Sequence, residues 1–238
     1  MSGKAAKLVL IRHGQSVWNE RNLFTGWVDI PLSQKGIEEA LNAGDRINNI
    51  PFDVIYLSTL VRAEMTAMLA MSRHNQDRVP CIIHRKDKEF MEMAKIHDPA
   101  TEKMTIPTYC HADLNERMYG KLQGLDKDET KKKFGEAQFK LWRRSFATPP
   151  PEGESLEMTA NRTLPFFKEG IIPHLEKGEN ILISAHGNSL RSIVMHLDSL
   201  SHDEVVKLEI PTGEPICYHF ENGSWKKQCI DECNKEFA

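Results

Sequence analysis

The sequence lacks the features of a membrane, secreted or nucleic-acid-binding protein. No apolar run approaches the roughly 20 residues that a membrane-spanning helix needs. The N-terminal segment offers only four consecutive apolar residues, at positions 8–11, too few for the core of a secretion signal. The formal charge of −3 provides no general basic surface for nucleic acid. We therefore expect a cytoplasmic protein with no membrane or nucleic-acid partner, which holds any anionic ligand through a local cluster of cations.

Cysteine is scarce and scattered. The chain has five cysteines, an odd number, and no C-x-x-C pair, which favours reduced thiols over a disulfide framework. Cys81 with His84, or Cys110 with His111, could begin a zinc site, but neither pair brings enough ligands at the usual spacing. We therefore expect no metal site.

Apolar runs of strand length alternate with longer segments of helical period. This is the pattern of a mainly parallel sheet with helices on both faces. The strands are predicted at residues 7–11, 53–58, 81–84, 180–184 and 216–221, with 224–229 as an edge partner across the Asn222-Gly223 turn. The predicted fold class is α/β, with one domain spanning residues 1–238.

Helices are predicted at residues 33–48, 60–71, 154–176 and 188–200, and a short one follows the capping box Ser201 to Glu204. Pro165 should kink the third of these helices. Residues 85–112 are polar, contain Pro99 and Pro107, and show no clean period. We interpret them as a long excursion from the domain.

Two of the apolar strands end alike, with a histidine followed by a glycine. The run LVLIR leads to His13, and the run ILISA leads to His186. Ligands of open α/β sheets bind outside the carboxyl ends of the strands, so both imidazoles are expected at one crevice, with Arg12 and Arg62 beside them. A single histidine after a strand is usually a surface or capping residue. A site is indicated here because a second histidine and two arginines are expected beside the first.

The chemistry expected of such a crevice is phosphoryl transfer. A neutral imidazole has a lone pair that can accept a phosphoryl group. Neighbouring guanidiniums disfavour the protonated ring and also balance the charge of the transferring group. We therefore expect His13 to be neutral.

The motif RHGQSVWN, at residues 12–19, resembles the signature of the histidine phosphatase superfamily. Five further blocks are similar to its phosphoglycerate mutase branch over nearly the whole chain: LFTGWVDIPLSQKG, LNERMYGKLQGLDKDET, FKLWRRSF, ISAHGNSLR and LEIPTGEPICY. The resemblance implies interconversion of 3-phosphoglycerate and 2-phosphoglycerate in glycolysis and gluconeogenesis. It also implies a phosphohistidine primed by 2,3-bisphosphoglycerate, no metal, small-molecule phosphoglycerates as partners, and a homodimer.

The resemblance assigns roles to individual residues. His13 resembles the phosphorylated nucleophile, and Arg12, Arg62 and His186 resemble its phosphate clamp. Glu116 resembles the general acid/base, a role for which we expect desolvation to raise its pKa toward neutrality. The residues implied in substrate binding are Asn19, Thr25, Gly26, Tyr119, Lys127, Arg143, Arg144, Gly187 and Asn188. Gln15 departs from the family, which usually has glutamate at this position.

Three alternatives stay open. A phosphatase or a bisphosphoglycerate synthase of the same superfamily would pass the phosphoryl group to water or to another acceptor. Thr25-Gly26 resembles the mutase form rather than the synthase form, and the Arg143-Arg144 pair favours recognition of a carboxylate over a promiscuous phosphatase. A catalytically silent phosphoprotein-binding module would be expected to have lost one of the five catalytic residues, and all five are present.

Overall fold

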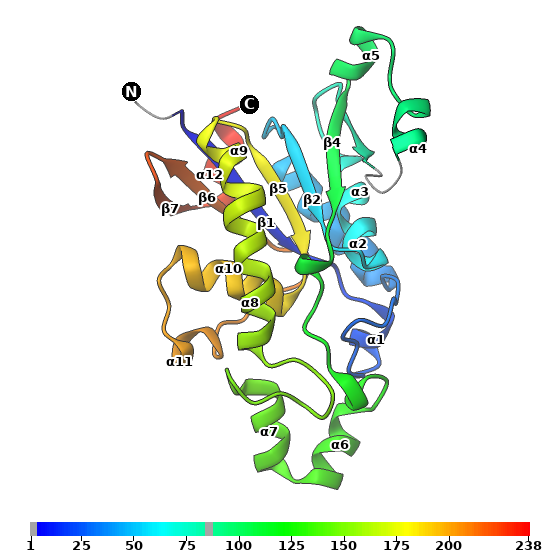
Figure 1. Ribbon diagram of the computed structural model, residues 1–238, viewed down its shortest axis with the longest axis vertical. Helices are drawn as coiled ribbons and strands as arrows, with labels where there is room; N and C mark the ends of the chain where they lie inside the picture. The colour runs from blue at the N-terminus through cyan, green and yellow to red at the C-terminus, as the bar shows by residue number, and fades with distance from the viewer. Residues whose placement is uncertain (1–3, 84–87) are drawn as a thin grey trace.

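The computed structural model describes residues 4–83 and 88–238, which form a seven-stranded sheet between two layers of helices (Figure 1). The strand order is β3-β4-β2-β5-β1-β6-β7. The strands are β1 (Ala6–Arg12), β2 (Val54–Leu57), β3 (Val79–Ile82), β4 (Thr105–Cys110), β5 (Ile181–Ala185), β6 (Pro215–Glu221) and β7 (Ser224–Gln228). The first five are mutually parallel, β6 is antiparallel to β1, and β7 is antiparallel to β6. The predicted α/β class is confirmed.

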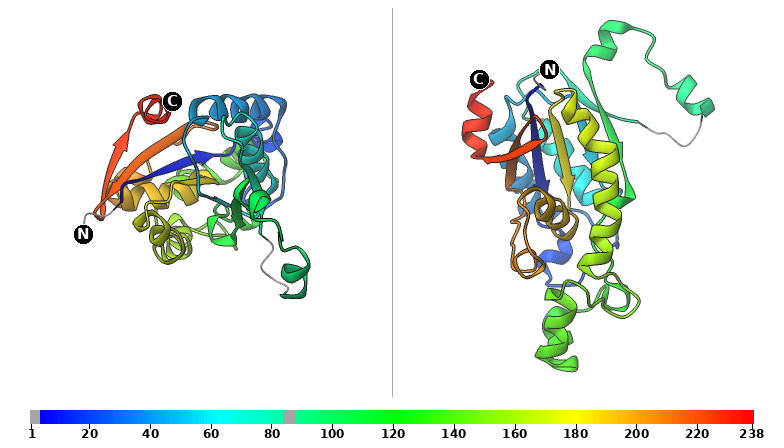
Figure 2. Two further views of the ribbon diagram at one scale, coloured as in Figure 1. Left: turned by 90° about the horizontal axis from the view of Figure 1, so that it is seen from above. Right: turned by 60° about the vertical axis from the view of Figure 1, so that its left-hand side comes forward.

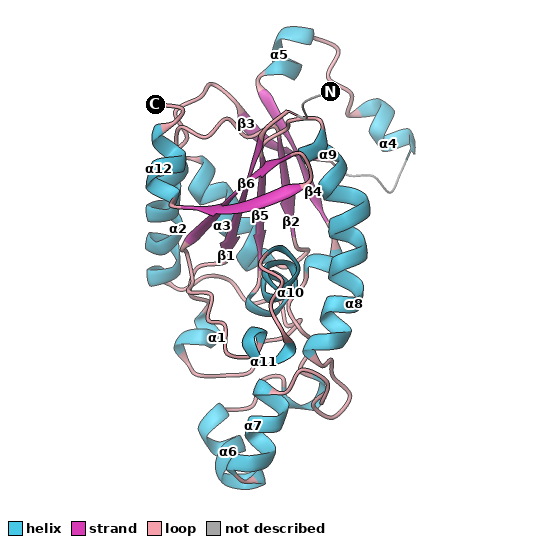
Figure 3. Ribbon diagram, turned by 90° about the vertical axis from the view of Figure 1, so that its left-hand side faces the viewer, coloured by secondary structure: helices cyan, strands magenta, loops and turns pink. Residues whose placement is uncertain are grey.

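Both faces of the sheet are covered, which explains why its central strands are continuous apolar runs. Along β1, Leu8 and Leu10 pack in the core under α8 (Leu156–Phe166), α9 (Ile172–Glu176) and α10 (Gly187–Leu197). Val9 and Ile11 point to the opposite core, under α2 (Gln34–Ile47), α3 (Val61–Met71) and α12 (Ile230–Lys235). Figures 2 and 3 show the two helix layers on either side of the strands.

The long helix predicted at 154–176 is one helical column with an irregular turn in it (Figure 1). Pro165 lies inside α8, and the following residues, η3 (Phe167–Ile171), form a π-helical turn before α9. Proline has no N–H to donate to the preceding turn, and α8 nevertheless continues to Phe166. The π turn begins two residues after Pro165, and the kink expected at Pro165 stays a prediction.

Within residues 85–112, predicted as an excursion, the segment β4 belongs to the sheet. It pairs with β2 on one side and with β3 on the other, and its Ile106 and Thr108 are buried. Ahead of it, α4 (Lys88–Met93) and α5 (Pro99–Lys103) form an arm that projects from the sheet (Figure 2). Residues 84–87 lie outside the described residues. They include His84, which was predicted as a strand end and as a zinc candidate, and the first residues of the excursion.

A second projection lies beyond the carboxyl ends of the strands (Figure 1). It is a helical hairpin of α6 (Lys127–Phe134) and α7 (Glu136–Arg144), joined at Gly135 with φ 83°. Trp142 of α7 packs with Phe24 and Leu122 in a small core of its own. The remaining short elements are α1 (Val17–Glu20), η1 (Ala112–Leu114), η2 (Gly120–Leu122) and α11 (His202–Val205). No helix among the described residues has the length and apolar character needed to cross a membrane.

Candidate active site

Three adjacent parallel strands deliver the central side chains of the site. β1 lies between β5 and β6, and β2 lies on the other side of β5. His13 follows β1 and His186 follows β5, and the backbone N–H of His13 donates to the carbonyl of Ala185 at 3.0 Å. The two ring centroids are 4.9 Å apart, and both residues are buried. The expectation that the two histidines share one edge of the sheet is met.

His13 is held in one tautomer. Its Nδ1 lies 2.7 Å from the carbonyl oxygen of Gly14. A carbonyl oxygen only accepts, so Nδ1 carries the proton and Nε2 keeps its lone pair. Burial, followed by the charges of Arg62 and Arg12, holds the pKa of His13 well below 6.5. The ring is therefore neutral near pH 7, as expected from the sequence.

His186 is held by a residue that the sequence did not single out. Its Nε2 lies 2.7 Å from the hydroxyl of Ser58, at the end of β2. The Ser58 oxygen also accepts the N–H of Leu60 at 3.2 Å. When the Ser58 hydroxyl donates to Nε2, Nδ1 carries the ring proton and is a donor. Burial, Arg62 and His13 lower the pKa of His186 well below 6.5.

Two guanidiniums lie against the histidines. Arg12 Nη1 donates to the carbonyl of Ile210 at 2.7 Å. Arg62, in the first turn of α3, donates to the carbonyls of Val28 and Gly26 at 2.9 and 2.7 Å. Burial lowers the pKa of Arg62 to about 10, so it stays charged at neutral pH. Backbone carbonyls therefore fix both cations in place before any ligand arrives.

Several buried donors of the site have no partner within the described part of the chain. They are Nε of Arg12, Nε of Arg62, Nδ1 of His186 and the hydroxyl of Thr25. A buried polar group without a hydrogen bond costs about 1–3 kcal/mol. Oxygen atoms of a bound anion would satisfy these donors, and a phosphoryl group carries several. The arrangement fits a phosphoryl ligand.

Glu116 sits in the 115–119 segment between η1 and η2, with 8% of the residue exposed. Its Oε1 accepts from the N–H of Arg117 at 2.8 Å and from the backbone and side-chain nitrogens of Asn188 at 3.1 and 2.9 Å. Burial alone would raise its pKa, but these hydrogen bonds and the charges of Arg12 and Arg62 outweigh burial and lower it. The expected rise of the Glu116 pKa is therefore wrong, because desolvation was weighed without the donors and cations around the carboxylate.

A small pocket opens over these groups, and most of the predicted substrate-binding residues line it. Lys127 stands in the first turn of α6 and Arg143 in the last turn of α7, so the two ends of the hairpin meet at the pocket. Burial lowers the pKa of both side chains. The lining consists of Arg12, His13, Asn19, Leu23, Phe24, Thr25, Gly26, Arg62, Glu116, Tyr119, Lys127 and Arg143.

Three predicted binding residues lie elsewhere. Arg144 pairs with Glu209 at 2.5 Å and is not among the lining residues, since neighbouring positions on a helix point about 100° apart. Asn188 contacts the carboxylate of Glu116. Gly187 leaves room beside Arg12: a Cβ at position 187 would lie 3.6 Å from Arg12 Nε. Gln15, the departure from the family, accepts a hydrogen bond from Ser33 at 2.8 Å.

Three further residues at the site were not expected from the sequence. Arg117 is buried, and its Nη2 donates to the hydroxyl of Tyr119 at 3.1 Å. Its place beside Glu116 in the LNERMYG block was the available signal. Leu23 and Phe24 were missed because apolar side chains before a turn carry no chemical signal.

No group of three or more His, Cys, Asp or Glu side chains in residues 4–83 and 88–238 is arranged to hold a metal ion.

The buried histidines should give the free energy of unfolding a dependence on pH. Both rings have a pKa below 6.5 in the folded protein, so below pH 6.5 the unfolded chain binds more protons than the folded one. The contribution of the neutral rings to stability is therefore fully present above that pH and is lost as the pH falls below it. We expect the variant carrying His13→Asn and His186→Asn to show a shallower slope by up to about 3 kcal/mol per pH unit. Denaturant unfolding between about pH 5 and 6.5 measures this slope, and an unchanged slope would show that neither ring is kept neutral.

Comparison with known protein families gives a consistent match. The family model described as histidine phosphatase superfamily (branch 1) matches residues 8–97 and 93–232. A curated protein of Protochlamydia amoebophila, named 2,3-bisphosphoglycerate-dependent phosphoglycerate mutase, is 57% identical over 93% of this chain and 98% of its own length. A curated protein of Arabidopsis thaliana, named 2,3-bisphosphoglycerate-dependent phosphoglycerate mutase 1, is 52% identical over 94% of this chain and 67% of its own length.

Solved structures share the fold at low sequence identity. A phosphoglycerate mutase from Bacillus anthracis aligns with a TM-score of 0.71 and 20% identity, covering 98% of this chain and 96% of its own. A mycobacterial glucosyl-3-phosphoglycerate phosphatase aligns with a TM-score of 0.71 and 21% identity, covering 94% of this chain and 97% of its own. Because the fold occurs in a protein named as a mutase and in one named as a phosphatase, the fold alone does not choose between these activities.

Proposed function

The chain belongs to the histidine phosphatase superfamily and, within it, to the 2,3-bisphosphoglycerate-dependent phosphoglycerate mutases, and from this premise we propose how its own residues carry out the reaction. The enzyme interconverts 3-phosphoglycerate and 2-phosphoglycerate through a phosphohistidine. The single observation that supports these residue roles best is the pair of buried, neutral histidines 4.9 Å apart beside two fixed arginines.

In the proposed first step, Nε2 of His13 takes a phosphoryl group from 2,3-bisphosphoglycerate. A P–O bond breaks, an N–P bond forms, and Glu116, which takes up a proton when the bisphosphate binds, passes that proton to the departing oxygen. The open donors of Arg12, Arg62 and His186 face the charge on the transferring oxygens. Because carbonyls already hold both arginines, little reorganisation is needed when that charge arrives.

In the second step, a bound monophosphoglycerate accepts the group from His13. Its hydroxyl loses a proton to Glu116, whose lowered pKa keeps it ionised and ready as a base. The bisphosphate formed then turns in the pocket and returns its other phosphoryl group to His13, so the monophosphoglycerate that leaves is the other isomer. Bound phosphates oppose the charges of Arg12 and Arg62, which raises the Glu116 pKa and makes the acid role easier.

Substrate recognition is proposed to use Lys127, Arg143 and Tyr119 together with Asn19, Thr25 and Gly26. These residues lie on the pocket wall and bring at least two cations to a ligand with a carboxylate and a phosphate. The names of the relatives above 50% identity favour the mutase over the phosphatase and the bisphosphoglycerate synthase.

The proposal is tested by following 2-phosphoglycerate formation from 3-phosphoglycerate with purified protein. We expect slow turnover from dephosphorylated enzyme and a large stimulation by catalytic amounts of 2,3-bisphosphoglycerate, since priming charges His13. Release of inorganic phosphate at a rate equal to or above isomerisation would favour a phosphatase instead.

We expect the enzyme to work without a metal ion. In the proposal, guanidiniums neutralise the charge of the phosphoryl oxygens. A divalent cation has this role in other phosphoryl-transfer enzymes. Exhaustive treatment with a chelator should leave kcat and KM unchanged. Activity that disappears and returns only with manganese would contradict this part of the proposal.

The proposal takes residues 1–238 as one phosphoglycerate mutase-like domain, and it extends to a cytoplasmic location and a homodimer. The location rests on the sequence features described above, and the homodimer rests on resemblance to the family. Light scattering on purified protein would measure the oligomeric state.

A further inference from the structure

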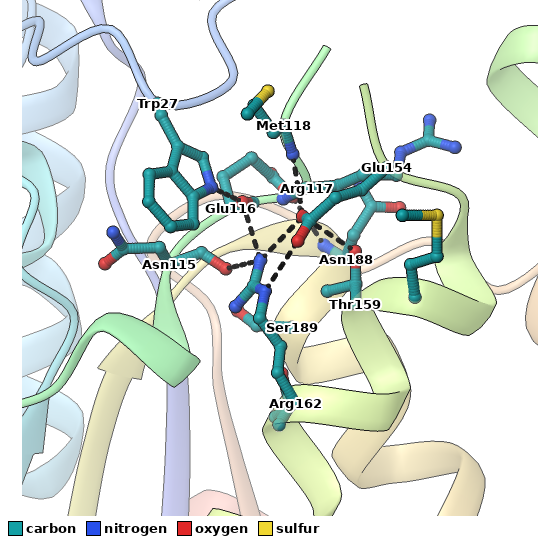
Figure 4. Close-up of polar contacts among 12 residues, drawn as sticks. Trp27, Asn115, Glu116, Arg117, Met118, Glu154, Thr159, Arg162, Asn188 and Ser189 are labelled. Carbon is teal, nitrogen blue, oxygen red and sulfur yellow. Dashed lines mark hydrogen bonds and ion pairs between the residues drawn. The ribbon is translucent and has the colours of Figure 1, made fainter. Parts of the chain in front are cut away.

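One arginine outside the pocket makes an unusual number of contacts with the segment that carries Glu116 (Figure 4). Arg162 lies on α8, and its side chain is 17% exposed. Its Nη1 donates to the carbonyls of Asp113 and Ala112 at 2.8 and 3.3 Å. Its Nη2 donates to the carbonyls of Asn115 and Glu116 at 3.0 and 2.9 Å. One guanidinium thus holds four backbone carbonyls of a five-residue segment.

Glu154 completes this arrangement from the start of the same helical region. Its carboxylate accepts from Nε and Nη2 of Arg162, each at 2.9 Å. The same carboxylate accepts the N–H of Met118 at 3.0 Å, and the backbone N–H of Glu154 donates to the carbonyl of Met118 at 2.7 Å. Because Glu154 is also largely buried, its ion pair with Arg162 is shielded from water. The pair therefore holds the backbone in place on both sides of Glu116.

The peptide bond between Glu116 and Arg117 links this arrangement to the carboxylate. Its carbonyl accepts from Arg162, and its N–H donates to Oε1 of Glu116 at 2.8 Å. In a trans peptide the C=O and N–H bonds point in opposite directions. A hydrogen bond that fixes the carbonyl therefore also aims the N–H, and donation from a charged group strengthens that N–H as a donor.

Trp27 supplies a second donor to the same carbonyl. Its indole Nε1 donates to the Glu116 oxygen, and its ring lies 5.5 Å from Cζ of Arg162. Neither Trp27 nor Arg162 is among the residues that line the pocket. Their hydrogen bonds reach the site through the backbone of Glu116, and the charge of Arg162 also contributes to the lowered pKa of His186.

We propose that Arg162, with Trp27 as its partner, is a positioning residue that orients the 116–117 peptide and thereby fixes the Glu116 carboxylate for proton transfer. This inference rests on the proposed acid/base role of Glu116. Arg162 itself touches neither the substrate nor the transferring group.

The test is Arg162→Lys, assayed for isomerisation from pH 5 to 8. Lysine keeps the charge but cannot hold several carbonyls in the plane of a guanidinium. We expect kcat to fall by about 10- to 100-fold, the usual cost of a misplaced acid/base, with the KM for 3-phosphoglycerate unchanged within about threefold. Losing the N–H donor raises the Glu116 pKa, so the activity of the variant relative to wild type should decline further as the pH falls.

Arg78→Lys is the matched control. Arg78 also donates to two backbone carbonyls, of Phe52 and Thr105, and pairs with a carboxylate, Asp53. It contacts the sheet away from the pocket, so its substitution should leave kcat and the pH profile unchanged. An Arg162→Lys enzyme with wild-type kcat and pH profile, or one that loses activity equally at every pH, would overturn the inference.

Trp27→Phe keeps the inference testable if Arg162→Lys does not fold. Trp27 is 37% exposed, so its substitution disturbs the core little. The inference predicts the same effects in smaller size: a lower kcat, an unchanged KM and a greater loss at low pH. An unchanged pH profile in Trp27→Phe would contradict it. Glu116→Gln separates the two proposals, because full activity there would remove the proposed role of Glu116, whereas inactivity there with normal Arg162 and Trp27 variants would remove only the positioning role.

Discussion

Replacing His13 by asparagine is expected to lower turnover by at least about four decades, with residual isomerisation close to the background of the assay. The reason is that, in the described part of the chain, the other ring nitrogen of this kind near the two arginines is engaged: His186 Nε2 is hydrogen-bonded to Ser58. Loss of a covalent nucleophile removes the intermediate, and enzymes with such nucleophiles typically lose several orders of magnitude. Steady-state formation of 2-phosphoglycerate in the presence of 2,3-bisphosphoglycerate measures the effect.

The control for this experiment is His97→Asn, a substitution at an exposed histidine on the segment between α4 and α5. It should retain full turnover. Asparagine at position 13 can still donate to the Gly14 carbonyl as His13 Nδ1 does, so the fold should survive. A His13→Asn protein that is folded and turns over within tenfold of wild type would show that the phosphoryl group takes another route.

Replacing Glu116 by glutamine is expected to reduce kcat by about two to four decades, the usual contribution of a positioned acid/base. Glutamine has the same shape and can still accept from Arg117 and Asn188 through its amide oxygen. It can neither take up nor release the proton of the substrate hydroxyl. Because the contacts are kept, we expect the KM for 3-phosphoglycerate to change little, and rates under saturating substrate measure the loss directly.

Glu157→Gln, at an exposed carboxylate in the first turn of α8, is the matched control and should be fully active. A Glu116→Gln enzyme with undiminished kcat would mean that another group or water moves the proton. The pKa of Glu116 is lowered in the free enzyme, so its carboxylate is already ionised and enters the second step as a base.

The positions of His13 and His186 could be predicted because the physics is local. A strand buried on both faces must be a continuous apolar run, and both runs end in histidine. Parallel strands place their carboxyl ends at one edge, so two histidines 173 positions apart in sequence were expected together. The same reasoning missed β4, whose Thr105–Cys110 segment has a proline in the middle and only one buried aliphatic residue, Ile106.

The support around Glu116 could not be predicted, because it depends on backbone atoms. Arg162 binds the carbonyl oxygens of residues 112, 113, 115 and 116, and every residue has a carbonyl, so no pattern of side chains marks these acceptors. The direction of the Glu116 pKa follows from a balance, in which burial raises the pKa and three nitrogen donors with two guanidiniums lower it. The two guanidiniums were expected near the site, but two of the three donors are backbone N–H groups, which no pattern of side chains marks.

The central claim, that His13 carries the phosphoryl group, is tested most directly by intact mass measurement after brief exposure to 2,3-bisphosphoglycerate. We expect a single added phosphoryl group on the wild-type chain, lost in acid and stable in alkali, mapped to His13 and absent from His13→Asn. An adduct of equal extent on His13→Asn, or an unmodified wild-type protein that isomerises phosphoglycerate at its full rate, would contradict it.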